Sequence, residues 1–172
     1  MSLKEFTAIK HKEAEKKEFN QRMFRGELTK EEYVKYLTSQ LAIFTEIEKF
    51  ELPNINLVRK DKTIEDLKEL DGNTLIENYN LNPSTTEYVN HLSKLNNETI
   101  LPHIYLNYLA LTYGGQMIKR GVPGSGKMYD FDDVQECINS IRLVQKDEWT
   151  DEVNKGFDFI IKILDELQEF SR

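Results

Sequence analysis

The chain has 172 residues, of which 39% are apolar, and its net charge is −7. A chain of this length forms about one domain and buries roughly 70% of the surface that the unfolded chain exposes. The composition excludes a disordered protein, and the negative charge argues against a general nucleic-acid-binding protein. No run reaches the ~18 uncharged apolar residues of a membrane span, and the N-terminus has no signal-peptide core, so we expect a soluble protein of the cytoplasm.

The single cysteine and the local charge limit the kinds of site that the chain can form. Cys137 is the only cysteine, which excludes an internal disulfide and argues against a thiolate metal cluster. We interpret it as a buried, unreactive thiol. The first segment is locally basic and is either a solvated helix face or a cationic surface that meets cofactor carboxylates or an acidic electron donor. Its cations are Lys4, Lys10, Lys12, Lys16, Lys17, Arg22 and Arg25.

The hydrophobic periodicity is helical almost everywhere. Thr29-Lys30-Glu31-Glu32 has the pattern of a capping box and predicts a helix that continues to about residue 50. A shorter helix is expected over 63–70, where an Asp-Gly-Asn turn ends it. Ser84 or Thr85 can cap the next helix, which carries apolar residues to Leu95.

The second half of the chain predicts three more helices. One runs over about 97–120, with Pro102 in its first turn, and the loop 121–126 follows it. The others lie across 134–143 and from about Thr150 towards the C-terminus. No strand pattern of useful length occurs in the sequence. We therefore predict an all-α, multi-helix bundle in which residues 1–172 form a single domain.

His11 stands out among the three histidines because Glu15 lies one helical turn later on the same face. A carboxylate there can accept a hydrogen bond from one imidazole nitrogen and leave the other free for a metal. The small Ala14 between them leaves room for a flat ligand. Glu–His pairs at this spacing are also common by chance, so an ordinary surface or core histidine is the alternative for His11, as it is for His91 and His103.

Gly114 and Gly115 interrupt an otherwise helical pattern, although each glycine costs about 1 kcal/mol relative to alanine in a helix interior. They predict a kink, or a backbone that lies very close to something bulky. Tight helix packing or a helix end is the alternative. Gly121 to Lys127 resembles a phosphate loop only superficially, because it lacks the required spacing and follows no strand, so no phosphate site is predicted.

Several motifs, in this order along the chain, resemble the haem oxygenase family, and together they cover nearly its whole length. In chain order, the five motifs given next resemble the family's proximal helix, the helix that follows it, the distal helix, the loop after the distal helix, and the closing helix. They are His11-Lys12-Glu13-Ala14-Glu15, LTKEEYVKYLTSQLAIFTEIE, His103 to Tyr108 running into Tyr113-Gly114-Gly115-Gln116, Gly121-Val122-Pro123-Gly124 and FDFIIKILDELQEF.

The resemblance implies a haem-degrading monooxygenase in which haem is both substrate and cofactor. His11 would ligate the haem iron, Glu15 would orient this imidazole, and Gly114 and Gly115 would line the distal face. Molecular oxygen would bind the open side of the iron, and a ferredoxin or a flavin-linked reductase would supply electrons. By analogy, the products would be biliverdin, ferrous iron and carbon monoxide.

The same resemblance suggests how the haem propionates are held. Lys4 stands where the family often places a basic residue for a propionate, and Tyr105 where it places a tyrosine hydroxyl. Arg142 corresponds to the propionate-binding arginine before the last helix. Cations suit these positions because haem carries two carboxylates, and pairing them fixes the rotation of the ring in its pocket.

Leu111 departs from the family pattern, in which an aspartate stands three residues before the first glycine. In the family this carboxylate organises the waters that deliver a proton on the distal side, and leucine cannot hold water in this way. Either Tyr113, Asn107 or Thr112 organises the waters instead, or the protein binds or senses haem without efficient turnover. We predict that Tyr113 and Asn107 act beside the two glycines in catalysis.

Two other kinds of protein were weighed against this function. A thiaminase-like hydrolase on the same helical architecture needs an activated cysteine, and Cys137 has no obvious activating neighbour. A purely structural bundle does not explain the paired glycines. Turnover with added reductant distinguishes an oxygenase from a haem-binding protein.

Overall fold

The computed structural model describes residues 1–75 and 79–171, and its regular elements are all helices over these ranges. The all-α prediction is therefore confirmed for the described residues. The α-helices are α1 (Leu3–Phe6), α2 (Ala8–Glu15), α3 (Glu18–Phe24), α4 (Lys30–Ile47), α5 (Lys60–Glu69), α6 (Gly72–Leu75), α7 (Pro83–Ser93), α8 (Leu101–Tyr113), α9 (Gly115–Lys119), α10 (Val134–Val144) and α11 (Thr150–Phe170). Short 3₁₀ turns lie at Ile55–Leu57, Lys127–Tyr129 and Asp147–Trp149.

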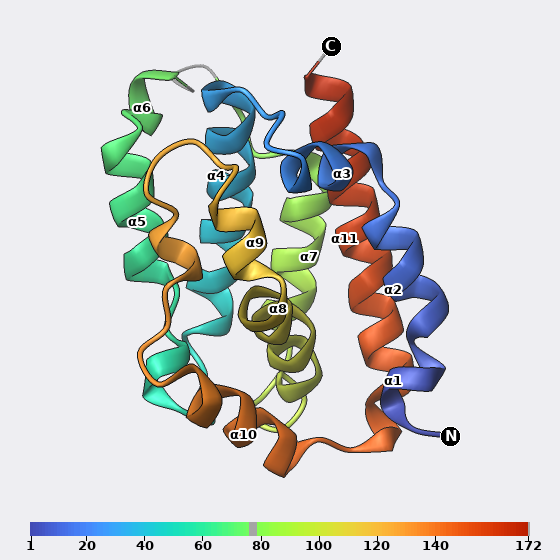
Figure 1. The fold of residues 1–172 in the computed structure, drawn as a ribbon. Coiled ribbons are helices and arrows are strands. Elements are labelled where there is room, and N and C mark those ends of the chain that lie inside the picture. Colours follow the sequence, from blue (N-terminus) through green and yellow to red (C-terminus); the bar gives the residue numbers. More distant parts are fainter. Residues whose placement is uncertain (76–78, 172) are drawn as a thin grey trace.

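The long helices α4 and α11 form a bundle with α7 and α8 (Figure 1). Helix α11 contacts α7 and α8 and is covered by α2 and α3 along another side, while α5 packs against α4 and α10 crosses one end of the bundle next to α8. Among the described helices, none is both long enough and apolar enough to cross a membrane.

The N-terminus of α4 forms as its sequence predicts. The Thr29 hydroxyl accepts a hydrogen bond from the Glu32 backbone N–H at 3.1 Å, and the Glu32 carboxylate accepts one from the Thr29 N–H at 2.9 Å. The cap predicted for α7 is wrong, because Asn82 is the N-cap residue and Ser84 and Thr85 lie inside the helix. The reason is Pro83, whose fixed φ suits the first helical position and moves the helix start to that residue.

The single helix expected over 97–120 is two helices, α8 and α9, with Gly114 between them. The backbone N–H of Gly114 still donates to the Ala110 carbonyl at a long 3.4 Å. The paired glycines therefore interrupt the helix as their pattern indicates, with the end of α8 at Gly114.

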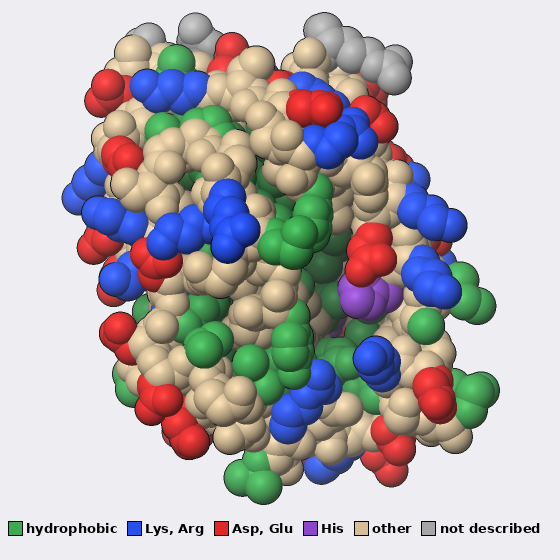
Figure 2. All heavy atoms as spheres, in the orientation of Figure 1, with side chains coloured by type: hydrophobic (Ala, Val, Ile, Leu, Met, Phe, Trp, Pro, Cys, Tyr) green, Lys and Arg blue, Asp and Glu red, His purple; other side chains and the backbone are tan. Residues whose placement is uncertain are grey.

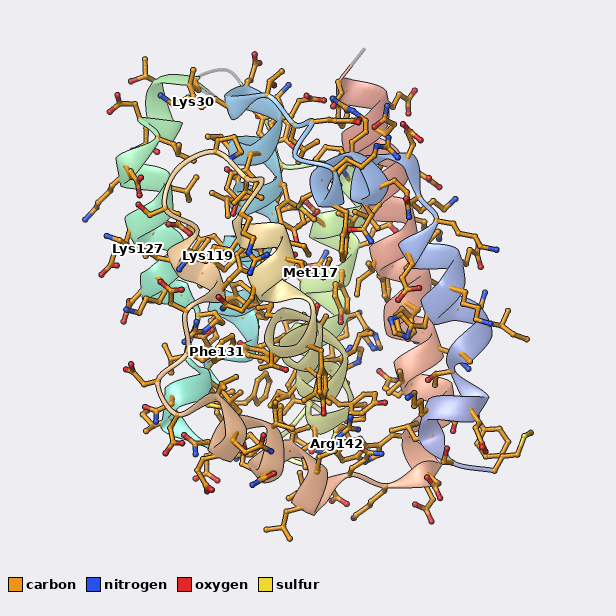
Figure 3. The ribbon with its side chains drawn as sticks, viewed as in Figure 1. Lys30, Met117, Lys119, Lys127, Phe131 and Arg142 are labelled. Carbon is orange, nitrogen blue, oxygen red and sulfur yellow. The ribbon has the colours of Figure 1, made fainter. Side chains whose placement is uncertain are left out.

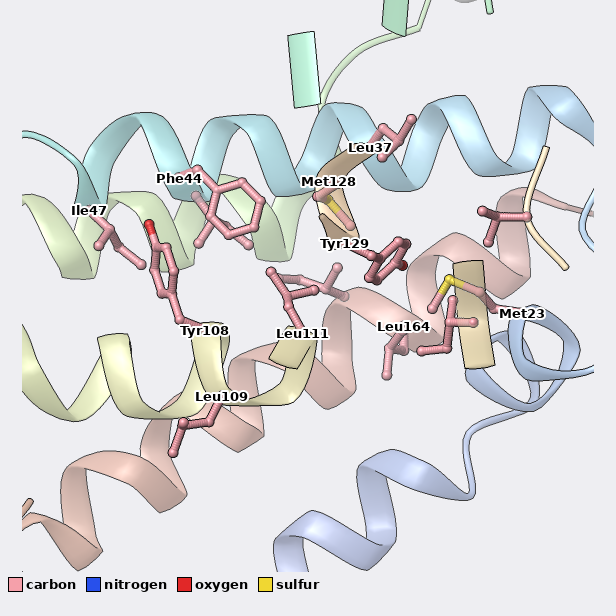
Figure 4. Packing of buried hydrophobic residues seen from close by; sticks show 14 of the residues in the cluster. Met23, Leu37, Phe44, Ile47, Tyr108, Leu109, Leu111, Met128, Tyr129 and Leu164 are labelled. Carbon is pink, nitrogen blue, oxygen red and sulfur yellow. The ribbon is translucent and has the colours of Figure 1, made fainter. Parts of the chain in front are cut away.

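Apolar side chains of α4, α8 and α11 meet in the main core (Figure 4), which includes Phe44, Leu111 and Leu164. The loop after α9 is fastened to this core by Arg59, a residue that is only 2% exposed. Its guanidinium donates to the backbone oxygens of Met128 and Asp130 at 3.1 and 2.6 Å and lies 3.7 Å from the ring centroid of Phe131, which is labelled in Figure 3. A buried cation held this way fixes the loop in one position.

Candidate functional site

A cleft lies between α2 and the α8–α9 pair, and α3 closes one end of it by contacting α9. Figure 2 shows apolar side chains lining this hollow, with a histidine and an acidic side chain at its rim. Large apolar side chains of α3, α8 and α9 remain exposed, namely Phe24 at 44%, Tyr113 at 62% and Met117 at 64%. Exposed apolar side chains gathered on neighbouring elements are typical of a ligand-binding surface.

His11 lies on α2, on the proximal side of this cleft. Its Nε2 atom is 3.0 Å from Oε1 of Glu15, and both side chains are 57% exposed, so the pair expected from the spacing forms within reach of a ligand. The imidazole also stacks on Phe157 of α11, with ring centroids 5.6 Å apart and an interplanar angle of 20°. Ala14, between the two residues of the pair, is 6% exposed. The ring is thus held from two sides, with its Nε2 atom facing Glu15.

The two glycines on the opposite side of the cleft differ in what surrounds them. A Cβ atom at Gly114 would meet only the Ala110 oxygen at 3.8 Å and the Phe24 ring at 3.9 Å, both ordinary contacts. A Cβ atom at Gly115 would lie 2.9 Å from Cδ1 of Tyr129, which is too close. Gly114 therefore has room for a methyl group beside Phe24 of α3, whereas Gly115 makes room for a buried tyrosine.

Three residues predicted to act on the cofactor come together at the α10 end of the cleft. The Arg142 guanidinium donates to the Tyr113 hydroxyl at 3.2 Å and lies 5.9 Å from the ring centroid of Tyr105 (Figure 3). Lys4 is exposed on α1, and its neighbour Leu3 belongs to the small apolar cluster against which Tyr105 packs. Arg142, Tyr105 and Tyr113 thus place one cation and two hydroxyls at one end of an otherwise apolar cleft.

Asn107 and Thr112 are occupied by other partners. The Asn107 amide donates to the Tyr88 hydroxyl and to the backbone oxygen of His103, both at 2.9 Å. The Thr112 hydroxyl donates to the Leu109 carbonyl at 2.8 Å. A catalytic role for Asn107 stays a prediction.

The sequence does not predict a network in which Glu152 joins the partly exposed His91 to the fully buried His103. Oε1 of Glu152 lies 2.5 Å from Nε2 of His91 and 2.8 Å from Nε2 of His103, while Nδ1 of His103 contacts the Tyr88 hydroxyl at 2.7 Å. Because the Glu152 carboxylate can only accept hydrogen bonds, a neutral His103 bonds to it through Nε2–H and accepts the Tyr88 proton at Nδ1. His103 therefore carries its own proton on Nε2 and donates it to Glu152.

The network has two interpretations, a metal site and a set of structural hydrogen bonds. The three atoms that face each other lie within 4.8 Å, a spacing that suits a metal ion. The distances are equally those of ordinary hydrogen bonds between two imidazoles and one carboxylate. Burial is the main reason that the pKa of His103 is lowered, and the hydrogen bond from His103 lowers the pKa of Glu152 to about 2. We interpret the network as a structural link between α7, α8 and α11.

Comparison with known proteins gives the context of this geometry. Residues 1–164 match the family model described as "Heme oxygenase". Curated relatives with that name come from Pyropia yezoensis, 27% identical over 98% of this chain and 85% of the relative, and from Porphyra purpurea, 26% identical over 78% and 66%.

Solved structures share the fold. A cyanobacterial heme oxygenase-1 from Synechocystis sp. PCC6803, in complex with heme, superposes with a TM-score of 0.82 at 21% identity and covers 97% of this chain and 90% of its own. The heme oxygenase of Leptospira interrogans gives a TM-score of 0.81 at 23% identity, over 96% and 100% of the two chains. The predicted bundle type is therefore confirmed.

Proposed function

The chain belongs to the haem oxygenase family, and we propose that haem lies in the cleft between α2 and the α8–α9 pair with its iron bound to His11. Members of this family are enzymes that degrade haem, and their products are biliverdin, ferrous iron and carbon monoxide. The observation that carries the proposal is an exposed imidazole, held by Glu15 and Phe157, on an apolar cleft whose other side includes Gly114, where no side chain covers the backbone.

Among the three histidines, His11 fits the ligand role best. His103 is fully buried and uses both ring nitrogens in hydrogen bonds, and His91 is bound to Glu152. His11 bonds only one nitrogen to Glu15, and rotation of the ring about its Cβ–Cγ bond selects which nitrogen faces the iron. A carboxylate bonded to one nitrogen fixes the tautomer and raises the basicity of the other, which strengthens a bond to iron.

The α10 end of the cleft suits the propionates. Arg142 presents a guanidinium beside Tyr105 and Tyr113, and we propose that it pairs with one propionate while Lys4 and the Tyr105 hydroxyl hold the other. A planar guanidinium binds a carboxylate through two parallel hydrogen bonds. Such a pair fixes the rotation of haem in the cleft, which selects the carbon at which the ring opens.

Bound haem supplies the iron that activates oxygen and is itself the substrate. The part of this chain is to orient the ring through His11 and Arg142, to let it approach the backbone at Gly114, and to keep water away through Phe24 and Met117. We propose molecular oxygen as co-substrate and a separate ferredoxin or flavin-linked reductase as electron donor. Both partners, like a cytoplasmic location, rest on the resemblance to the family.

One observation favours a second candidate function, a haem-binding protein without efficient turnover. Leu111 is 5% exposed and belongs to the main core, so position 111 offers no polar group on the distal side. The family's carboxylate at this position organises the waters that carry a proton. Turnover therefore requires another source of ordered water.

The test is haem reconstitution followed by absorption spectroscopy, in the wild type, His11→Ala and the matched control Lys12→Ala, an exposed residue of the same helix. We expect stoichiometric binding with a Soret band in the wild type and the control. His11→Ala should lose the band, and added imidazole should restore it. An unchanged spectrum in His11→Ala would show that His11 is not the ligand.

Turnover is then followed with an electron donor and with catalase present to remove free peroxide. Conversion of the Soret band to a bilin band is expected for an oxygenase. A stable, His11-dependent Soret band under the same conditions would establish the haem-binding alternative. Failure of the wild type to bind haem would refute both functions.

A further inference from the structure

Three tyrosines lie together behind the distal helix. Tyr33 and Tyr36 are on α4, with ring centroids 6.1 Å apart, and Tyr129 ends the short 3₁₀ turn in the loop after α9. Tyr33 is 0% exposed and Tyr129 is 1% exposed. Neither of these two hydroxyls has a hydrogen-bond partner within the described ranges.

A buried hydroxyl without a partner destabilises a fold, because it gives up water and gains nothing in return. Phenylalanine would fill nearly the same volume without that cost. Buried polar groups that lack a protein partner are commonly satisfied by an ordered water, which needs two to four polar neighbours. The three phenols together offer that number.

The three hydroxyls also influence one another. Burial, followed by the neighbouring phenols Tyr36 and Tyr33, raises the pKa of Tyr129, and burial raises the pKa of Tyr36 to about 12. All three side chains therefore keep their protons at neutral pH and can donate hydrogen bonds.

The cluster lies where the two sides of the cleft meet. Tyr36 packs on Phe19 of α3, with ring centroids 6.1 Å apart, and the ring of Tyr129 fills the space left by Gly115 at the start of α9. Figure 4 shows Tyr129 and Leu111 directed into the same part of the core between α4 and α8. The phenols thus stand close to the position where the family has its carboxylate.

The other polar groups of the distal helix are already engaged. Asn107 and Thr112 donate to partners within the protein, and the Tyr113 hydroxyl accepts a hydrogen bond from Arg142. The unpartnered hydroxyls near position 111 are those of Tyr33 and Tyr129, as far as the structure describes the chain.

We propose that Tyr33, Tyr36 and Tyr129 bind buried water between α4 and the α8–α9 junction, and that this hydrated cluster takes over the water-ordering role of the carboxylate missing at Leu111. The first half of the proposal concerns the protein without haem. The second half rests on the proposed function, because it requires haem in the cleft.

The water site is tested in the haem-free protein by a double-mutant cycle of Tyr33→Phe and Tyr129→Phe, measured as unfolding midpoints in denaturant. If both hydroxyls bind one water, each single substitution lowers the midpoint, and the double variant loses less than the sum of the two. A direct bond between the hydroxyls would give the same coupling, so a crystal structure of the haem-free protein must also show density for a water bonded to the phenols, and coupling without that water would overturn the proposal. If the hydroxyls are simply unpaired, each phenylalanine leaves the midpoint unchanged or raises it, and the effects add. This second result would overturn the proposal whether or not the protein binds haem.

The role towards haem is tested on the ferric complex by the pH midpoint of its visible spectrum, which reports the proton held on the open side of the iron. Hydrogen-bond donors favour the deprotonated form, so Tyr129→Phe should raise this midpoint by about one unit. Ser125→Ala, an exposed residue of the same loop outside the cluster, serves as the control and should leave the midpoint in place. An unchanged midpoint in Tyr129→Phe, with the double-mutant coupling present, would confine the cluster to a structural water and refute the catalytic half.

Discussion

The different packing around Gly114 and Gly115 predicts that adding one methyl group has opposite consequences at these neighbouring positions. In Gly115→Ala the new Cβ would lie 2.9 Å from Cδ1 and 3.4 Å from Cβ of Tyr129. The contact is near the root of that side chain, so the ring cannot simply swing away. Overpacking of this kind costs about 1–3 kcal/mol, and the better helix propensity of alanine returns up to ~1 kcal/mol.

We therefore expect Gly115→Ala to lose roughly 1–2 kcal/mol of unfolding free energy, which lowers Tm by about 2–8 °C for a protein of this size. In Gly114→Ala the nearest atoms are at 3.8 and 3.9 Å, so the haem-free protein should keep its stability within about 0.5 kcal/mol. The same methyl group projects towards the cleft and should weaken haem binding by about tenfold or more.

The assay is thermal unfolding of both haem-free variants, together with haem titration followed by the Soret band. Equal losses of stability in the two variants would refute the assignment of Gly115 to Tyr129. Unchanged haem affinity in Gly114→Ala would refute the placement of haem against this residue.

Three further substitutions test the connections between helices. Glu152→Gln should lose roughly 1–3 kcal/mol, because it weakens two imidazole hydrogen bonds. The pKa of Glu152 is lowered from 4.5 to about 2 in the folded protein, so its contribution to the free energy of unfolding is present above pH 4.5 and is lost as pH falls towards 2. Denaturant unfolding measured across this pH range should therefore show a smaller loss of stability with acid in the variant than in the wild type. Gly156→Ala should destabilise α11 although alanine favours helix, because its Cβ would clash with the Leu106 side chain, and a higher Tm would contradict this packing. Gly121→Ala places a Cβ 2.8 Å from the Cα of Gly26, so the backbone must move; we expect at least ~1–3 kcal/mol of lost stability by denaturant unfolding, and a neutral effect would show that this contact can relax.

Most of the helices could be predicted from short local patterns in the sequence. The capping box at Thr29 needs only four consecutive residues, and the break at Gly114 follows from the intrinsic cost of glycine in a helix. The start of α7 differs from the prediction because the fixed φ of Pro83 is a stronger local signal than the capping side chains of Ser84 and Thr85.

Only part of the candidate functional site could be predicted from the sequence. The contact of His11 with Glu15 follows from helical spacing and is present, whereas its stacking on Phe157 joins residues from opposite ends of the chain. The His91–Glu152–His103 network is missed for the same reason, because its members come from three helices and show no common spacing. No periodicity in the sequence reports such a meeting, and it appears only once the helices are packed.

Helix α11 explains how the two sides of the cleft keep their separation. Adjacent residues of this helix touch opposite sides: Gly156 lies against His103 on α8, and Phe157 stacks on His11 of α2. The lack of a side chain at Gly156 lets α8 approach α11 closely, while the bulk of Phe157 sets the position of the imidazole. One turn earlier, Glu152 fixes the start of α8 through His103. The geometry between the proposed iron ligand and the distal helix is thus set by a helix that belongs to neither side, because a packed core transmits a displacement of one helix to its neighbours.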